Sequence, residues 1–323
     1  MSNENHVRYL AEADVRACLP SIEGQVDLAA EALLALADGS AEMPLKMGVH
    51  PRLKAVVNAM PAWSRSRDVV GLKWIATYGC NPSRGLPPID ALIILSDADT
   101  GRPTDILDGR YITAVRTAAV TGVAIRLFGV RAARRVAILG AGTQGRSHAA
   151  LMPDLLPNAE ARIHDRHPER AEALAGWLRA RGHGAIATQD PREAVNDAEV
   201  VVTVAGVAPG SQSMGLGWLH PDALIVAVDA DTYAPAALAR TASAFLVDDR
   251  ARFLAYQSDG AFPGYPLPSD TLGEALLGRR RRDELSPGRV LVCPLGIGLA
   301  DVLFADAVRR EADARGMGTM LPR

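Results

Sequence analysis

The sequence has few cysteines and no marked excess of charge of either sign. Cys18, Cys80 and Cys293 lie far apart among 323 residues and form no Cys-x-x-Cys pair, which argues against a disulfide framework or a structural zinc site. A net charge of −2 gives no long-range attraction for nucleic acid or for an anionic membrane surface. These absences predict a protein of a reducing compartment, the cytoplasm, that uses no metal and binds neither nucleic acid nor membrane.

Long apolar runs and a leader are absent as well. We expect no membrane span, because no apolar stretch approaches the roughly 20 residues that cross a bilayer. Residues 1–19 lack the basic and apolar regions of a signal peptide. The remaining composition, 48% hydrophobic and 22% charged, is ordinary for a globular protein, and the length allows two domains.

Two patterns follow one another along the chain. Residues 6–37 predict a short strand and then helix, with Asp14 or Ser21 as candidate caps. Three strand-like runs between residues 53 and 101 predict an antiparallel or mixed sheet. From residue 113 a helix of small residues precedes alternating short apolar strands and helices, which is typical of a parallel, doubly wound sheet. The predicted fold is therefore α/β, a Rossmann-type doubly wound parallel sheet plus an N-terminal α+β domain.

A glycine pattern in residues 140–145 predicts a dinucleotide site. Gly140, Gly142 and Gly145 form Gly-x-Gly-x-x-Gly between an apolar run and a helical pattern, as the turn, the pyrophosphate approach and helix–strand packing require. Asp165 ends the next strand-like run, where an acid accepts the ribose hydroxyls and repels a 2′-phosphate. NAD is therefore expected; Arg166 leaves NADP possible, and a turn without nucleotide is the structural alternative. The predicted cofactor-binding residues are Gly140, Gly142, Thr143, Gln144, Gly145, Asp165, Arg166 and Thr203.

The region before the glycines resembles a known family. Residues 97–119, DADTGRPTDILDGRYITAVRTAA, precede GAGTQG by about twenty residues, and the chain resembles the ornithine cyclodeaminase/μ-crystallin family over almost its whole length. That family includes cyclising deaminases, ketimine reductases and amino-acid dehydrogenases, all acting by hydride transfer at an amino acid's α-carbon. The resemblance implies a homodimer, with a substrate-binding and dimerisation domain over 1–118, to which 300–323 returns, and an NAD-binding domain over 119–299.

The resemblance also assigns candidate substrate cations. Lys73 lies in an apolar strand-like run, where a charge is costly unless it is paired or faces a cleft, and its family counterpart contacts the carboxylate or the reacting carbon–nitrogen group. Arg116, in a small-residue helix, would bind the carboxylate as a fork. Lys46 stands where many relatives have arginine. The structural alternatives are an edge-strand lysine for Lys73, a structural arginine bonded to a carbonyl or an acid for Arg116, and a solvated lysine for Lys46.

Asp231 is the candidate for proton chemistry. It follows the buried run 224–228 together with Asp229, at the carboxyl end of the predicted sheet, and the resemblance maps Asp231, not Asp229, onto the family's acid/base aspartate. A neighbouring carboxylate and partial burial would raise the pKa of one of the two; helix caps or turn formers are the alternative. Asn58 stands where ornithine-cyclising members carry glutamate, which counts against ornithine. Residues 232–238, TYAPAAL, stand where the family usually has Pro-Gly-Lys-x-Glu-Leu.

Together with the residues, the resemblance implies an NAD(H)-dependent oxidoreductase of small amino or imino acids, with Asp231 and Lys73 catalytic and Lys46, Lys73, Arg116 and Asn58 binding substrate. A cyclodeaminase that recycles NAD, or a non-catalytic small-molecule-binding protein, are the alternatives. We expect His148 on a helix surface, His164 at a strand end, His50 near the site or in a turn, and residues 278–285 at a solvated helix end. The last helix, 299–316, is strongly amphipathic and could cover either domain.

Overall fold

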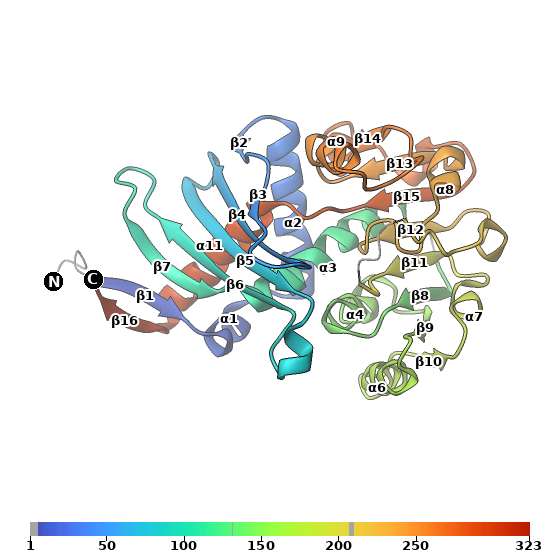
Figure 1. The fold of residues 1–323 in the computed structure, drawn as a ribbon, viewed down its shortest axis with the longest axis horizontal. Helices are drawn as coiled ribbons and strands as arrows, with labels where there is room; N and C mark the ends of the chain where they lie inside the picture. The colour runs from blue at the N-terminus through green and yellow to red at the C-terminus, as the bar shows by residue number, and fades with distance from the viewer. Residues whose placement is uncertain (1–5, 131, 207–209) are drawn as a thin grey trace. The chain divides into compact units, whose positions relative to one another are not determined.

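The computed structural model describes residues 6–130, 132–206 and 210–323. The chain divides into two compact units, Met1–Arg116 with Ile297–Arg323 (unit 1) and Thr117–Gly296 (unit 2). Each unit is built on its own sheet (Figure 1).

Unit 1 contains a mixed sheet, as its strand-like runs predict. Its strand order is β16-β1-β7-β6-β5-β4-β2, with β3 also paired to β4. Strands β1 and β7 are parallel, whereas the other pairs are antiparallel. The strands are β1 His6–Leu10, β2 Ala41–Glu42, β3 Met47–Val49, β4 Ala55–Ser64, β5 Val69–Tyr78, β6 Ile89–Ser96, β7 Pro103–Asp108 and β16 Thr319–Pro322.

The helices of unit 1 are α1 Glu12–Cys18, α2 Ile22–Ala37, the 3-10 turn Asn81–Arg84 and α11 Gly298–Arg315. Ser21 caps α2 by accepting from the Gly24 N–H, while Asp14 lies inside α1 and accepts from Ala11 N. The last helix belongs to unit 1, where α11 packs on β4, β5 and β6. Its expected amphipathicity is wrong for its first half, because every residue from Gly298 to Asp306 is buried.

Unit 2 contains the parallel, doubly wound sheet that the sequence predicts. Its order is β10-β9-β8-β11-β12-β15-β13-β14 and all its pairs are parallel. The order reverses between β8 and β11, and ligands of such sheets bind at the carboxyl ends beside this reversal. The strands are β8 Arg135–Leu139, β9 Glu160–His164, β10 Ala185–Thr188, β11 Val200–Thr203, β12 Leu224–Ala227, β13 Ala244–Val247, β14 Asp270–Thr271 and β15 Val290–Cys293.

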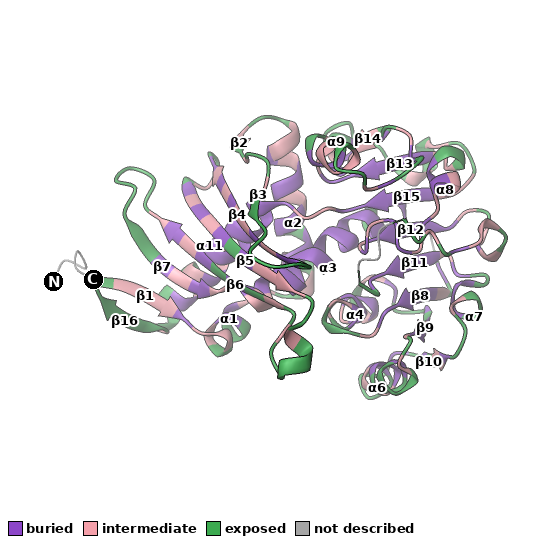
Figure 2. Cartoon of the chain, in the orientation of Figure 1, coloured by how far each residue is buried: buried purple, intermediate pink, exposed green. Residues whose placement is uncertain are grey.

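The central strands of unit 2 are apolar on both faces because helices cover both. Every residue of β11, β12, β13 and β15 is buried, as Figure 2 shows by colour. The helices after α3 (Gly109–Phe128) are α4 Thr143–Ala149, α5 Met152–Leu155, α6 Pro168–Arg179, α7 Pro191–Val195, α8 Ala236–Thr241, α9 Arg250–Ser258 and α10 Leu272–Leu277, with 3-10 turns at Leu216–Trp218 and Arg282–Glu284.

Helix α3, Gly109–Phe128, corrects one expectation. It has 20 residues and a mean hydropathy of 1.3, so by length and composition it matches a bilayer span. The small residues Ala, Gly and Thr hide this apolar character from inspection of the sequence. Because 89% of its apolar window is buried inside the protein, α3 has the surroundings of a core helix.

Candidate functional site

The glycine loop joins β8 to α4, and two of its glycines are required by packing. Gly140 has φ +114°, and a Cβ there would lie 2.6 Å from the Val204 carbonyl. A Cβ on Gly145 would lie 2.0 Å from the Gly140 oxygen. The Cβ of any side chain at either position would therefore collide with backbone atoms. The first and third glycines thus keep the turn tight and α4 close to the sheet.

Gly142 differs because its surroundings are open. It is exposed, its φ of −77° suits any residue, and a Cβ on it would meet no atom within 4 Å. Packing therefore does not explain the glycine, whereas a ligand that approaches the backbone here would. Thr143 beside it is exposed, and the Oε1 atom of Gln144 is buried with no hydrogen-bond partner among the described residues. The open backbone at Gly142 and Thr143 fits the pyrophosphate of a dinucleotide.

Asp165 lies directly after β9 and is bonded to the same loop. Its Oδ2 accepts from Ala141 N at 2.7 Å and its Oδ1 from His167 N at 2.9 Å. Each carboxylate oxygen can accept more than one hydrogen bond, so capacity for two ribose hydroxyls remains. Arg166 next to it is exposed.

A cluster of cations surrounds one carboxylate in unit 1. Lys73 on β5 is completely buried, and its Nζ lies 2.6 Å from Asp301 Oδ2 on α11 and 3.4 Å from Thr113 Oγ1 on α3. Burial, with the nearby positive charge of Arg116, lowers the pKa of Lys73 to about 7, although Asp301 acts in the opposite direction. The positive charge of Lys46 also lowers this pKa.

Arg116 shares the same carboxylate. Its Nε donates to Asp301 Oδ1 at 2.9 Å, whereas its two terminal nitrogens have no hydrogen bond to a residue that the structure describes. The predicted Lys73 and Arg116 are thus brought together by the carboxylate of Asp301, and the charge of the predicted Lys46 acts on Lys73.

Asn58 lies on the same face of the sheet as Lys73. It precedes by two residues Met60, the register partner of Lys73, and alternate residues of a strand share a face. Its register partner on β3 is Gly48, where a Cβ would lie 2.7 Å from Asn58 Oδ1. This position therefore offers an amide close to the backbone of β3 and no negative charge.

Two aspartates follow β12, and their oxygens are used differently. Asp229 accepts from Thr203 Oγ1 at 2.5 Å with Oδ1 and from Ala205 N at 3.0 Å with Oδ2. It thereby fastens the end of β12 to the end of β11. Burial raises the pKa of Asp229 to about 6, with a smaller contribution from the charge of Asp231.

Asp231 has an open acceptor. Its side chain is completely buried, and Oδ2 accepts from Gly210 N at 3.0 Å. Its Oδ1 is buried and has no hydrogen-bond partner among residues 6–130, 132–206 and 210–323. A buried acid with one unpaired oxygen is suited to receive and release a proton.

Comparison with known proteins shows the family of the chain. The model of the ornithine cyclodeaminase/mu-crystallin family matches residues 7–249. The chain belongs to this family. The chain is also 30% identical over 321 residues to the nodulation efficiency protein NfeD of Rhizobium meliloti, which covers 98% of each chain.

Other members of the family carry more specific names. A Δ1-pyrroline-2-carboxylate reductase of Bacillus cereus is 23% identical over 272 residues, 81% of this chain and 83% of its own. Among solved structures, an archaeal alanine dehydrogenase dimer with bound NAD is 25% identical, with a TM-score of 0.86 over 98% of this chain and 99% of that one. The Rossmann-type α/β fold of this family member is therefore confirmed.

The sequence missed Asp301 in this family member, since an acid in a helix near charged residues resembles a solvent-facing one. It also misplaced His148, which is buried rather than on the surface of α4. His148 Nδ1 donates to the Gln144 carbonyl at 2.8 Å, so Nε2 accepts from Thr121 Oγ1 at 2.9 Å. Burial lowers the pKa of His148 to about 4 and keeps it neutral.

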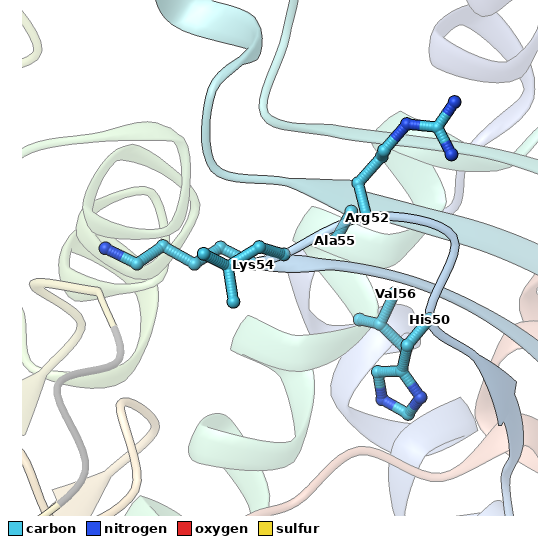
Figure 3. A pocket seen from close by; sticks show the side chains of 6 residues that line it. His50, Arg52, Lys54, Ala55 and Val56 are labelled. Carbon is cyan, nitrogen blue, oxygen red and sulfur yellow. The ribbon is translucent and has the colours of Figure 1, made fainter.

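The remaining candidates differ in their burial and contacts. His164 is buried at the end of β9. His50 lines an open hollow with Arg52 and Lys54, and Figure 3 shows these three side chains pointing in different directions, so they do not converge on one ligand. In the run 278–285, Arg282 is part-buried and donates to the carbonyls of Asp222 and Gly288, so this stretch is only partly solvated.

Proposed function

We propose that the chain is an NAD(H)-dependent oxidoreductase that transfers hydride at the α-carbon of a small amino or imino acid, as an amino-acid dehydrogenase or an imine reductase. The observation that carries this proposal is the buried cluster in unit 1, where Lys73 and Arg116 share the single carboxylate of Asp301 and the charge of Lys46 also acts on Lys73. Buried charge is costly unless it is paired, so the excess of cations favours an anionic ligand. The names of relatives, a pyrroline-carboxylate reductase and an alanine dehydrogenase, support an α-carboxylate.

The cations have distinct roles in this proposal. Arg116 is held through Nε, so its two terminal nitrogens serve as a fork for the substrate carboxylate. Lys73, with a pKa of about 7, donates a hydrogen bond to the substrate and exchanges a proton near neutrality. Lys46 adds positive charge without the fork geometry. Asn58, a neutral amide, disfavours a substrate with a distal ammonium group.

The cofactor is assigned to unit 2, with NAD favoured over NADP. The backbone at Gly142 and Thr143 binds the pyrophosphate, the unpaired amide oxygen of Gln144 is available to a hydrogen-bond donor of the cofactor, and Asp165 accepts hydrogen bonds from the ribose hydroxyls. NAD, when bound, supplies the group that accepts or returns hydride. Thr203, although predicted as a cofactor ligand, donates its hydroxyl to Asp229, so we assign it a supporting role.

Asp231 manages the proton. When hydride adds to the carbon of a C=N bond, the nitrogen must gain a proton, and in the oxidative direction that proton must leave. The unpaired Oδ1 of Asp231 accepts it, while the Gly210 N–H holds Oδ2 in place. Asp229 has both oxygens engaged and keeps the ends of β11 and β12 together.

Unit 1 also carries a surface that suits a homodimer. On the sheet face opposite Lys73, Trp74 is 49% exposed and its neighbour on β6, Leu92, is 43% exposed. Leu72 and Ile94 continue this face, half-buried and paired in register. Contiguous exposed apolar side chains mark association sites. We therefore propose a cytoplasmic homodimer in which unit 1 binds substrate and dimerises and unit 2 binds NAD.

The test is to follow NADH absorbance while amino acids are offered with NAD, and cyclic imines or 2-oxo acids with amines are offered with NADH. A substrate-dependent change that Asp231→Asn lowers by about 100- to 10,000-fold, with NADH affinity retained, supports the proposal. The Asn variant keeps an oxygen for the Gly210 N–H. Ammonia release from a diamino acid without net NADH change would instead indicate a cyclodeaminase. NADH binding with no turnover of any candidate would indicate a non-catalytic protein.

A further inference from the structure

Asp301 connects the two cations on which the proposed substrate site depends. It lies in the first turn of α11 and is completely buried. Its Oδ2 lies 2.6 Å from Lys73 Nζ, and its Oδ1 accepts from Arg116 Nε at 2.9 Å. One rigid carboxylate thus joins side chains from β5 and α3, each cation taking a different oxygen.

This arrangement controls both geometry and charge. Asp301 orients the guanidinium plane of Arg116, because Arg116 is bonded to it through Nε. The carboxylate thereby sets the direction in which the two terminal nitrogens of Arg116 point. Lys73 is buried beside the positive charges of Arg116 and Lys46. Without an adjacent negative charge, a lysine in such surroundings loses its proton.

We propose that Asp301 is a positioning residue that holds Lys73 and Arg116 as one carboxylate-binding pair. This rests on the proposed function in that the ligand is taken to be a substrate carboxylate. Asp301 touches the two cations and acts on the substrate through them. It also keeps Lys73 protonated near neutrality, so that Lys73 binds the carboxylate as a cation.

The groups that face Lys73 come from three other elements. Asp301 comes from α11, Arg116 and Thr113 come from α3, and Lys46 comes from the segment between β2 and β3. Of these charges, that of Asp301 favours the proton on Lys73, whereas those of Arg116 and Lys46 oppose it. The removal of the Asp301 charge therefore has a defined direction.

A direct measurement is available because the chain has only three lysines, Lys46, Lys54 and Lys73. In full-length protein labelled with 13Cε-lysine, the Lys73 signal is assigned by its loss in Lys73→Arg and followed by NMR against pH. We expect a midpoint of about 7 in the unaltered protein and a midpoint about one to three pH units lower in Asp301→Asn. This readout needs no activity.

The matched control is Asp306→Asn. Asp306 lies on the same helix, is equally buried, and pairs with Arg309 and Arg310 rather than with Lys73. We expect it to leave the Lys73 midpoint unchanged. In kinetics at pH 8, Asp301→Asn should raise KM for the carboxylate substrate by about 10- to 100-fold, with a smaller change in kcat, and the difference in KM should narrow as pH falls and Lys73 regains its proton.

Asp301→Glu covers the case in which Asp301→Asn folds poorly, because it keeps the charge and moves the carboxylate by one methylene. We expect it to raise KM and to leave Lys73 titrating nearer pH 7 than in Asp301→Asn. An unchanged Lys73 midpoint in Asp301→Asn, or an unchanged KM in Asp301→Glu, overturns the proposal, as do equal effects of Asp301→Asn and Asp306→Asn. If no substrate turns over in the unaltered protein, the proposed function fails while the NMR titration still decides the role of Asp301.

Discussion

Replacing Gly142 by alanine should separate cofactor binding from folding. The new methyl group meets no protein atom within 4 Å, and the φ of −77° is one that alanine adopts without strain. Gly→Ala at such a position stabilises a fold by up to about 1 kcal/mol through the unfolded chain. The melting temperature should therefore stay the same or rise slightly.

The same methyl group occupies the space in front of the loop. If the pyrophosphate lies there, it must move away and lose at least one charge-assisted hydrogen bond, which is worth about 1.5–3 kcal/mol. That loss corresponds to NADH binding about 10- to 150-fold more weakly. The assay is a fluorescence titration of NADH, with thermal unfolding of the same samples.

Two other glycines provide the comparison. Gly184, before β10, also has no atom within 4 Å of an added Cβ, so Gly184→Ala should change neither NADH affinity nor melting temperature. Gly145→Ala should lower the melting temperature, because its Cβ would lie 2.0 Å from the Gly140 oxygen. Unchanged NADH affinity in Gly142→Ala, with the fold intact, would refute the assignment of the pyrophosphate to this loop.

Four further outcomes follow from the described contacts and exposures. The fold disfavours the protonated form of Lys73, whose pKa is about 7. Between pH 7 and 10 the free energy of unfolding should therefore rise with pH relative to that of Lys73→Met, by at most about 1.4 kcal/mol per pH unit. The same pH dependence of urea unfolding in both proteins would contradict this. Thr121→Val should cost about 1–3 kcal/mol in urea unfolding at pH 7, because it leaves Nε2 of the buried His148 unpaired, and no loss would show that this bond is dispensable. The pKa of His148, lowered to about 4, means that its contribution to stability is lost as pH falls from about 6.5 to 4, which the same series extended to acid measures. Trp74→Glu on the exposed sheet face of unit 1 should convert a dimer to a monomer in light scattering after gel filtration, whereas an unchanged mass would place the interface elsewhere.

The sequence predicts those parts of the fold that depend on local patterns. Strands β4, β5 and β6 alternate between a buried and a more exposed face, and the central strands of unit 2 are short apolar runs between helices. The environment of α11 was not predictable from its pattern. Its acids resemble a polar face, yet Asp301 and Asp306 are buried. Asp301 pairs with Lys73 and Arg116 from other elements, and Asp306 pairs with Arg309 and Arg310 of the same helix.

The candidate site likewise combines residues that local patterns predict with a residue that they do not. The glycine loop is local, so its spacing alone indicates which glycines are fixed by backbone contacts. A charge inside an apolar strand singles out Lys73. Asp301 could not be found in this way, since it lies 185 positions from Arg116 and carries no motif. What decides its role is a long-range contact, which neither periodicity nor composition encodes.

The two aspartates after β12 show why the hydrogen-bond pattern must be read together with the pKa. Asp229, with its pKa raised to about 6 by burial, would be chosen as the proton carrier on titration alone. Both of its oxygens, however, accept hydrogen bonds from Thr203 and Ala205, so protonation there would weaken the bonds that hold the ends of β11 and β12 together. Asp231 has a buried oxygen that no described residue occupies, so a proton can arrive and leave without disturbing the sheet. The availability of an acceptor, rather than the extent of the pKa shift, therefore favours Asp231 as the acid/base group.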